Sequence, residues 1–355
     1  MLLLQIILLL LPVICSAGDR KPRHYEINLD EPPSQRWNQV IKDHLEYLPG
    51  VVEETKKYIP KPLQPFVWWA ASKIDRYFTT EIQEELKGIA SESGLPIGEI
   101  VGMNILYDVA AFDRRHIFGL GCTSIVAQNS AGQIIHGRNL DYDMTELLKN
   151  ITIHVDFVRN GTIQYSGLTF ALYNGVLTGQ RPGEYSVSLN ARYSGAYIDN
   201  ILMEFYTKFK RPVSFFIRDV LENQATYTEA VDAFSRTHLF SPSYIIVAGI
   251  KKNEGVVISR NRWSAANVYP LNVDANQWFL VETNFDNWKK QGDDRRITAI
   301  QKLKELGRRN FDEKSMVEVL STVPVRNNLT VFSTVMVPGL PDSADYFRQS
   351  TWILP

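Results

Sequence analysis

The chain has 355 residues, a formal net charge of −1 at pH 7 and 45% hydrophobic residues. This is the composition of an ordinary globular protein with one large or two smaller domains, and it excludes a disordered or fibrous protein. No charge asymmetry along the chain suggests a basic surface, so we expect no nucleic acid partner.

Residues 1–17, MLLLQIILLLLPVICSA, are predicted to form a secretory signal peptide, although the stretch has no basic residue at its start. The small residues Ser16–Gly18 suit cleavage. No apolar run of membrane-spanning length follows, so we expect a soluble mature protein. Asn150, Asn160 and Asn328 each begin an N-glycosylation sequon, which is consistent with the secretory pathway.

The next elements are predicted from periodicity and from turn residues. Residues 18–37 are polar and Pro-rich with a short strand-like YEINL, and residues 37–115 have mostly helical spacing. Strands are expected at 151–159, 162–172, 184–192, 244–249, 255–261, 278–284 and 330–337, and helices at 197–209, 213–222, 227–236, 295–307 and 313–321. This order suits an α+β fold in which helices pack outside a two-layer sheet core.

The stretch from Gly121 to Asp143 is predicted to be a β-hairpin with a turn at Asn129–Gly132. Cys122 would then lie across from Arg138 or Asn139, with a register uncertain by one residue. Either register brings a thiol, a guanidinium and the carboxylate of Asp141 to one end of the hairpin. Such a thiol is a plausible nucleophile.

The cysteine count supports the same region. Cys15 lies in the expected signal peptide, so the mature chain keeps Cys122 alone, either as a buried apolar residue or as a reactive group. His136 is the one histidine on the hairpin, and strand alternation does not show that it faces Cys122. We interpret it as a strand histidine that meets solvent or a backbone carbonyl.

Several ordered motifs carry a resemblance to a known family. CTSIVA followed by HGRNLDY resembles the nucleophile hairpin of the acid ceramidase and N-acylethanolamine-hydrolysing acid amidase family. The resemblance continues through Thr178-Gly179, ETNFDNW at 282–288 and DDRR at 293–296, and it includes residues 25–37 and 86–107. It therefore spans most of the mature chain.

The resemblance implies a four-layer αββα fold of the N-terminal-nucleophile hydrolase type. It also implies that the precursor cuts itself between Gly121 and Cys122. The products would be a mostly helical α-subunit, 18–121, and a catalytic β-subunit, 122–355, which stay together as a heterodimer. The cut would free the α-amino group of Cys122, with an ordinary pKa of about 7.7–8.0, to act as the base for its own thiol.

The resemblance also assigns roles to side chains. Cys122 would be the nucleophile, Arg138 and Asp141 would orient its amine and thiol, Asn284 would be the oxyanion-hole donor, and Arg295 would belong to the same site. Without the resemblance, Arg138 and Asp141 would be interpreted as a structural ion pair at the end of the hairpin. Asn284 would be interpreted as a turn residue, and Arg295 as a surface charge at the start of a helix. Asp293 or Asp294 is expected to cap that helix.

One position departs from the family pattern. Ser188–Arg192 reads SLNAR, and the family places an acidic residue where this chain has Ala191. The resemblance implies that this carboxylate assists self-cleavage, so its absence puts processing in doubt.

The family acts on amides of long-chain fatty acids. The short segment between Asp141 and Ile153 and the lack of extra cysteines resemble the amidase branch, whereas Leu177 and residues 25–37 and 86–107 look closer to acid ceramidase. We predict hydrolysis of N-acylethanolamines to fatty acid and amine at acidic pH. The alternatives are cleavage of ceramide to sphingosine and fatty acid, and a non-catalytic lipid-binding paralogue.

Other classes are less well supported. A penicillin- or bile-acid-type amidase would share the hairpin, but the downstream ETNFDNW and DDRR segments argue against it. The histidines are scattered and no cofactor motif is present, so neither a metal nor a cofactor is expected. The signal peptide, the sequons and the resemblance together predict a lysosomal or secreted protein.

Residues 64–78 are predicted to form a helix whose apolar stripe includes Phe66 and Phe78 and packs inward. Trp68 and Trp69 fall off that stripe, and Trp69 shares a face with Lys73 and Arg76. Aromatic and basic residues on an outer face suit an anionic membrane, and burial under a neighbouring subunit is the alternative. Replacing both tryptophans with alanine is expected to lower vesicle binding and to spare folding.

Overall fold

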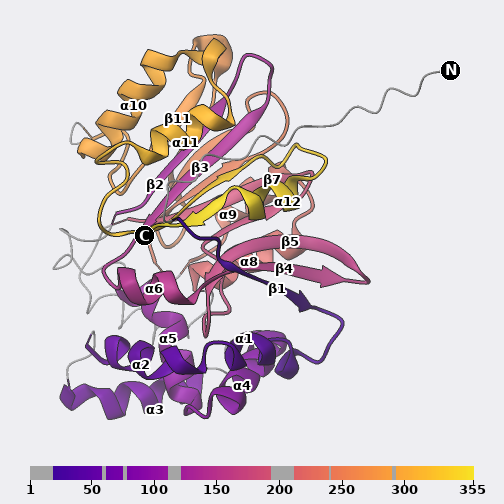
Figure 1. The fold of residues 1–355 in the computed structure, drawn as a ribbon, viewed down its shortest axis with the longest axis vertical. Helices are drawn as coiled ribbons and strands as arrows, with labels where there is room; N and C mark the ends of the chain where they lie inside the picture. Colours follow the sequence, from indigo (N-terminus) through magenta and orange to yellow (C-terminus); the bar gives the residue numbers. More distant parts are fainter. Residues whose placement is uncertain are drawn as a thin grey trace.

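The computed structural model describes residues 19–57, 61–74, 78–110, 121–192, 212–239, 241–289 and 293–355. The expected signal peptide 1–17, the helix expected at 197–209, and Arg76 lie outside the described residues. Figure 1 shows the N-terminal helices gathered at one end of the molecule and the two α-helices within 294–321 at the other.

The N-terminal part is mostly helical, as predicted, with short 3₁₀ turns between some of the helices. Its helices are α1 (Asn38–Lys42), α2 (Leu48–Lys57), α3 (Gln64–Ile74), α4 (Thr80–Ser93) and α5 (Ile97–Ala110). Helix α4 begins where the Thr79 side chain accepts a hydrogen bond from the amide of Ile82, and it ends at Gly94 with a φ of 70°.

Two β-sheets form the centre of the molecule. The five-stranded sheet has the order β11 (Phe279–Glu282), β2 (Thr123–Gln128), β3 (Ile134–Asp141), β12 (Thr330–Met336), β13 (Thr351–Ile353). The eight-stranded sheet has the order β1 (Arg23–Asn28), β4 (Thr152–Arg159), β5 (Thr162–Phe170), β6 (Thr178–Arg181), β7 (Tyr185–Ala191), β8 (Ser243–Ala248), β9 (Gly255–Arg260), β10 (Ala265–Pro270).

Helices cover the outer face of each sheet. Apolar residues of α10 (Asp294–Leu306) and α11 (Glu313–Ser321) form one core cluster with the five-stranded sheet. The larger sheet packs against the N-terminal helices and against α8 (Val213–Asn223) and α9 (Tyr227–Arg236). The expected four-layer αββα order is confirmed (Figure 1). Short elements that periodicity did not predict are α6 (Thr145–Ile151), α12 (Ser343–Gln349), β6, β10 and β13.

Strand alternation decides which side chains lie between the sheets. Ile125 and Ala127 of β2 belong to the outer cluster with α10 and α11, whereas Val126 packs in a small inter-sheet cluster with Ile246 of β8. Ser124 has the same parity as Val126 and therefore faces the larger sheet too. Because Cys122 precedes Ser124 by two residues, it shares that face.

The N-terminal part is joined to the rest through more than helix packing. The predicted strand-like segment YEINL falls on β1, an edge strand of the larger sheet that pairs in parallel with β4. Glu85 of α4 is fully buried and accepts from Arg218 of α8 at 2.7 Å and from the Trp37 indole at 3.0 Å. Burial alone would raise the pKa of Glu85, but Arg218 and Arg36 hold it below its ordinary value.

Candidate active site

The β2–β3 hairpin has the predicted turn, and its register places Cys122 at the end of the pairing. Thr123 lies opposite Asn139 and Ser124 lies opposite Arg138. Cys122 itself lies just before the first paired residue. Arg138 is therefore its diagonal neighbour on the same face, not its direct partner.

Arg138 reaches the cysteine from this diagonal position. Its Nη2 donates to Cys122 Sγ at 3.4 Å, and its Nη1 donates to Asn190 Oδ1 at 3.4 Å. The guanidinium is fully buried, and none of the described carboxylates forms an ion pair with it. The interpretation of Arg138 and Asp141 as a structural ion pair with each other is therefore wrong.

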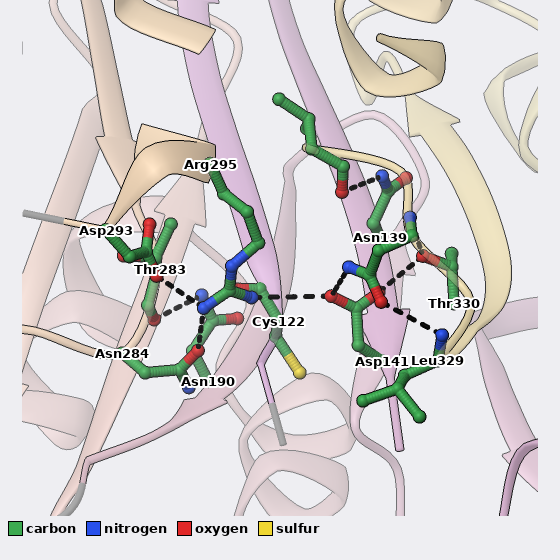
Figure 2. Close-up of polar contacts among 12 residues, drawn as sticks. Cys122, Asn139, Asp141, Asn190, Thr283, Asn284, Asp293, Arg295, Leu329 and Thr330 are labelled. Atoms are coloured by element: carbon green, nitrogen blue, oxygen red, sulfur yellow. Dashed lines mark hydrogen bonds and ion pairs between the residues drawn. The ribbon is translucent and has the colours of Figure 1, made fainter. Parts of the chain in front are cut away.

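Asp141 pairs instead with Arg295 from the start of α10. Arg295 Nη1 lies 3.3 Å from Asp141 Oδ2 and 3.3 Å from the carbonyl oxygen of Cys122, and Nη2 lies 3.1 Å from Asn284 Oδ1. Figure 2 shows the guanidinium between Asp141 and Asn284, directly above Cys122. Arg295 is thus not the surface charge that its position alone suggested, and the cap of α10 is Asp293, which accepts from the Arg296 amide.

The local electrostatics favour neutral forms of the buried acids. Burial raises the pKa of Asp141 to about 6, although Arg295 and the donors Thr330 and Asn327 oppose the rise. Burial also raises the pKa of the Cys122 thiol, and the positive charge of Arg138 opposes that effect. A base beside the sulfur is therefore needed to make it a nucleophile.

Asn284 is brought to the site by the pairing of β11 with β2, which places Glu282 opposite Ser124. Its Nδ2 donates to the carbonyl oxygen of Ala191 at 2.8 Å while its Oδ1 accepts from Arg295. The structure thus gathers all five predicted site residues in one cluster around the thiol and the carbonyl of Cys122: Cys122, Arg138, Asp141, Asn284 and Arg295.

Two further side chains belong to this centre, and our sequence analysis gave neither a site role. Asn190 Oδ1 accepts from Ser124 at 2.9 Å, and its Nδ2 donates to the backbone oxygens of Glu282 and Thr283. Asn190 belongs to the SLNAR segment that carries the family resemblance, directly before Ala191. His136 is the second residue: its ring nitrogens lie 2.9 Å from the hydroxyls of Ser186 and Ser188.

The expected environment of His136 is therefore wrong. The side chain meets neither solvent nor a backbone carbonyl, and no hydrogen bond joins it to Cys122 within the part of the chain that the structure describes. Burial and the nearby charge of Arg138 lower the pKa of His136 to about 3. The environment therefore favours the neutral ring.

Glu282 gives the first testable prediction. Burial raises its pKa to about 8 even though Arg296 donates to it at 2.5 Å. Because the folded pKa is above the ordinary value of 4.5, this group stabilises the fold fully below about pH 4.5, and that contribution is lost as the pH rises through 8. Between pH 6.5 and 8 we expect the free energy of unfolding to fall by about 1–2 kcal/mol.

Glu282→Gln should remove this fall, because the amide imitates the neutral acid. Denaturant unfolding at pH 6.5 and pH 8 measures it. The exposed Glu318→Gln on α11 is the control and should keep the wild-type slope. If the free energy of unfolding fell equally between pH 6.5 and pH 8 in wild type and in Glu282→Gln, Glu282 would already be ionised at pH 6.5.

The predicted membrane-contact residues have different environments. Trp69 is 59% exposed and Lys73 of the same helix is exposed, but Trp68 is half-buried against α5. A Cβ added at Gly102 would lie 2.2 Å from the Trp68 ring, so the glycine opens a slot that the indole fills. Because the indole fills this slot, we expect Trp68→Ala to destabilise the fold, unlike the sequence-based expectation for the double variant.

The remaining observations concern the glycosylation sequons, membrane-spanning helices and metal-binding side chains. The sequon residues Asn150, Asn160 and Asn328 are all exposed. None of the described helices is long and apolar enough to cross a membrane. No cluster of three or more metal-binding side chains occurs among the described residues.

An apolar pocket lies beside Tyr142. It is enclosed by α2, α5, β5 and the segment after β3, and its wall includes Tyr142, which directly follows Asp141. Its lining consists of Val51, Thr55, Met103, Tyr142, Met144, Leu148, Ile151, Phe170, Ala171, Leu172, Tyr173 and Leu177. A larger cavity of about 570 Å³ between α4 and α8 has charged walls and none of the site residues, so it is not part of this centre.

Comparisons with known proteins agree with this geometry. Residues 20–78 match a family model described as the beta subunit of N-acylethanolamine-hydrolyzing acid amidase, and residues 122–308 match linear amide C–N hydrolases of the choloylglycine hydrolase family. The bile-acid-type enzymes are thus part of the wider family and not a separate alternative. A mutant conjugated bile acid hydrolase from Clostridium perfringens aligns at a TM-score of 0.40 and 14% identity, over 61% of this chain and 86% of its own.

Full-length relatives give a stronger match. Acid ceramidase of Homo sapiens is 35% identical over 88% of this chain and 82% of its own length. N-acylethanolamine-hydrolyzing acid amidase of Oryctolagus cuniculus is 34% identical over 92% of this chain and 89% of its own length. This chain is therefore an amide hydrolase that belongs to the family of acid ceramidase and N-acylethanolamine-hydrolysing acid amidase.

Proposed function

We propose that the chain is a self-activating cysteine amidase that hydrolyses fatty-acid amides, with N-acylethanolamines as substrates, at acidic pH. One observation carries the proposal. The buried Cys122 thiol and the peptide bond before it lie within one cluster of cations and amide donors, formed by Arg138, Arg295 and Asn284.

In the first step the Cys122 sulfur attacks the carbonyl carbon of Gly121. The bond from that carbon to the Cys122 nitrogen breaks, the nitrogen takes up a proton, and a thioester joins Gly121 to the sulfur. Water then hydrolyses the thioester and releases the thiol and the α-amino group of Cys122. Arg295 holds the Cys122 carbonyl, which belongs to the following peptide bond, at 3.3 Å, and its guanidinium also lies against Gly121. It therefore fixes the residues on both sides of the bond that is cut.

In the second step the freed amine takes the thiol proton, and the sulfur attacks the amide carbonyl of the substrate. The proton passes to the leaving amine, the carbon–nitrogen bond breaks, and an acyl thioester remains until water releases the fatty acid. Asn284 Nδ2 serves as oxyanion donor once it leaves the carbonyl of Ala191, which occupies it in the continuous chain.

The cleavage step yields a prediction at Gly121. A Cβ built there would lie 2.1 Å from Nη1 of Arg295, so alanine would push the guanidinium away from Cys122 and Asp141. We expect Gly121→Ala to slow self-cleavage at least about tenfold. The rate of fragment appearance on a denaturing gel measures the effect.

Gly50→Ala is the matched control, because a Cβ at Gly50 meets nothing closer than 3.7 Å. It should be processed at the wild-type rate. Unchanged processing in Gly121→Ala would mean that the position of Arg295 is irrelevant to the cut.

The apolar pocket beside Tyr142 supports a lipid acyl chain as the substrate tail. Its volume of about 60 Å³ is far below the 300–1,000 Å³ of ordinary ligand pockets. We propose that α2 and α5 separate from the β5 side once the chain is cut, which lets the tail enter. The N-terminal part stays bound through β1 and the Glu85–Arg218 pair, so the active form is a heterodimer.

Ceramide is the second substrate, because the relatives carry both names at similar identity. The test compares an N-acylethanolamine and a ceramide with the same acyl chain at acidic pH. We expect the larger kcat/KM for the N-acylethanolamine. The reverse order would assign the chain to ceramide hydrolysis, and no turnover of either by fully cut protein would support the non-catalytic lipid-binding alternative.

Delivery of such substrates requires a membrane, and we propose that Trp69 makes the contact in a lysosomal or secreted protein. Trp69→Ala should reduce binding to anionic vesicles severalfold without changing the thermal midpoint, because the side chain is exposed. Co-sedimentation with vesicles measures binding. The control is Trp263→Ala, an equally exposed tryptophan elsewhere, and equal losses in both variants would rule out a specific role for α3.

A further inference from the structure

A chain of buried side-chain hydrogen bonds runs between the two sheets and ends at the cysteine. It begins at Ser186 of β7, crosses to His136 of β3, and returns to Ser188 of β7. From there it passes to Ser124 of β2 at 2.9 Å and then to Asn190 at 2.9 Å. All five residues have no exposed surface.

The direction of every bond in this chain is determined by Asn190. Its Nδ2 donates to the backbone oxygens of Glu282 and Thr283 at 3.0 and 2.9 Å, so its Oδ1 must face the opposite way. A carbonyl oxygen only accepts, which requires the Ser124 hydroxyl to donate to it. Ser124 therefore accepts from Ser188.

The same reasoning fixes the histidine. Because the Ser188 proton is used toward Ser124, Ser188 must accept from Nε2–H of His136. The neutral ring then accepts at Nδ1 from Ser186. All bonds point toward the Asn190 oxygen, and hydrogen bonds aligned in one direction strengthen one another.

The Asn190 oxygen is where this chain meets the reaction centre. Nη1 of Arg138 also donates to it, which leaves Nη2 directed at Cys122 Sγ at 3.4 Å. On its other side, Asn190 holds the two backbone oxygens that directly precede Asn284. A rotated Asn190 amide would turn its NH₂ group toward a guanidinium, and both of these contacts would be lost.

We propose that His136 is a positioning residue for amide hydrolysis, which acts through Ser188 and Ser124 to hold Asn190 in the orientation that directs Arg138 at the thiol. It does not act as an acid or a base. This inference rests on the proposed role of Cys122 as the nucleophile, and it does not depend on which lipid amide is cleaved.

Two serines of one strand make a matched test. Ser186 and Ser188 are both buried on β7 and each bonds one nitrogen of His136, but only Ser188 connects the ring to Ser124. Ser188→Ala should lower kcat about tenfold with KM within twofold of wild type. Ser186→Ala should stay within about twofold in both. Ser186→Ala loses one buried hydrogen bond and Ser188→Ala loses two, so the thermal midpoint of each variant is measured beside its kcat.

His136 itself offers a second matched pair. In His136→Gln the amide nitrogen can take the place of Nε2 and donate to Ser188, whereas His136→Asn reaches only the place of Nδ1. Gln should therefore restore activity that Asn does not. The kcat–pH profile should keep its shape in every variant, because the ring does not titrate in the working range.

A readout without any substrate separates this inference from the proposed function. Cys122 is the single thiol after residue 17, so its alkylation by iodoacetamide can be followed by intact mass. We expect Ser188→Ala to change the alkylation rate at a given pH at least about threefold, and Ser186→Ala to match wild type. Equal rates and equal kcat values for the two serine variants would overturn the proposal, even if the wild type proves to hydrolyse a different amide.

Discussion

Cys122→Ala should abolish hydrolysis and leave the protein as one uncut chain. The sulfur is the attacking atom in both proposed steps, and alanine supplies neither a nucleophile nor a thiol that could be activated. We expect at least about a 10⁴-fold loss of kcat, as for other enzymes that lose their nucleophile. Release of fatty acid from an N-acylethanolamine measures the loss, and a denaturing gel shows the chain.

Thr123→Val is the control for this variant. Thr123 is equally buried and adjacent, it faces α10 and α11, and its hydroxyl has no hydrogen-bond partner among the described residues. It should be cut and active like wild type. Residual hydrolysis by Cys122→Ala near the wild-type rate would assign the chemistry to another group.

Asn284 should show the second large effect. A side-chain donor aimed at a developing oxyanion contributes roughly 3–4 kcal/mol, so its loss should lower kcat by about 10²–10³-fold. Asn284→Asp is the sharper variant, because it keeps the oxygen that accepts from Arg295 and replaces the donor with an acceptor. We expect it to be as inactive as Asn284→Ala while KM changes little.

The comparison variant is Asn310→Ala. Asn310 donates to the carbonyl of Leu306 at 3.0 Å, the same type of bond that Asn284 makes to Ala191, but at an exposed site. It should leave kcat unchanged. If Asn284→Asp retained most of the wild-type kcat, Nδ2 of Asn284 would not be the donor to the oxyanion. Another hydrogen-bond donor would then have to fill that role.

Local patterns were sufficient for the hairpin and for most strands and helices. The turn at Asn129–Gly132 and the alternation in β2 gave the right element, and the uncertain register was resolved only by the pairing of Ser124 with Arg138. Asn284 and Arg295 are more than 150 residues from Cys122 in sequence. Only the family resemblance connected them with the thiol, because no local signal encodes that contact.

Side-chain contacts between the layers of the fold could not be predicted from the sequence. Whether His136 faces Cys122, solvent or the other sheet depends on how two sheets stack, which periodicity does not specify. The position of Trp68 was beyond the sequence for a similar reason. A helical stripe shows which face is apolar, but Gly102 on the neighbouring helix makes the room for an indole outside that stripe.

Ala191 stands where the family pattern has an acidic residue that assists self-cleavage. Self-cleavage is therefore the central claim to test. Asp141 is a buried carboxylate that is joined through Arg295 to the Cys122 carbonyl. Its pKa of about 6 leaves it largely protonated in an acidic compartment. We expect it to replace the missing acid, and the family's acidic residue at 191 to be dispensable here.

Intact-mass analysis of the purified protein after incubation at acidic pH tests this claim most directly, beside the Cys122→Ala variant. The account predicts a fragment that begins at Cys122 and extends to Pro355 in the wild type, with no such fragment in the variant. A wild-type chain that stays whole while it hydrolyses amides, or a fragment that also forms in Cys122→Ala, would contradict it.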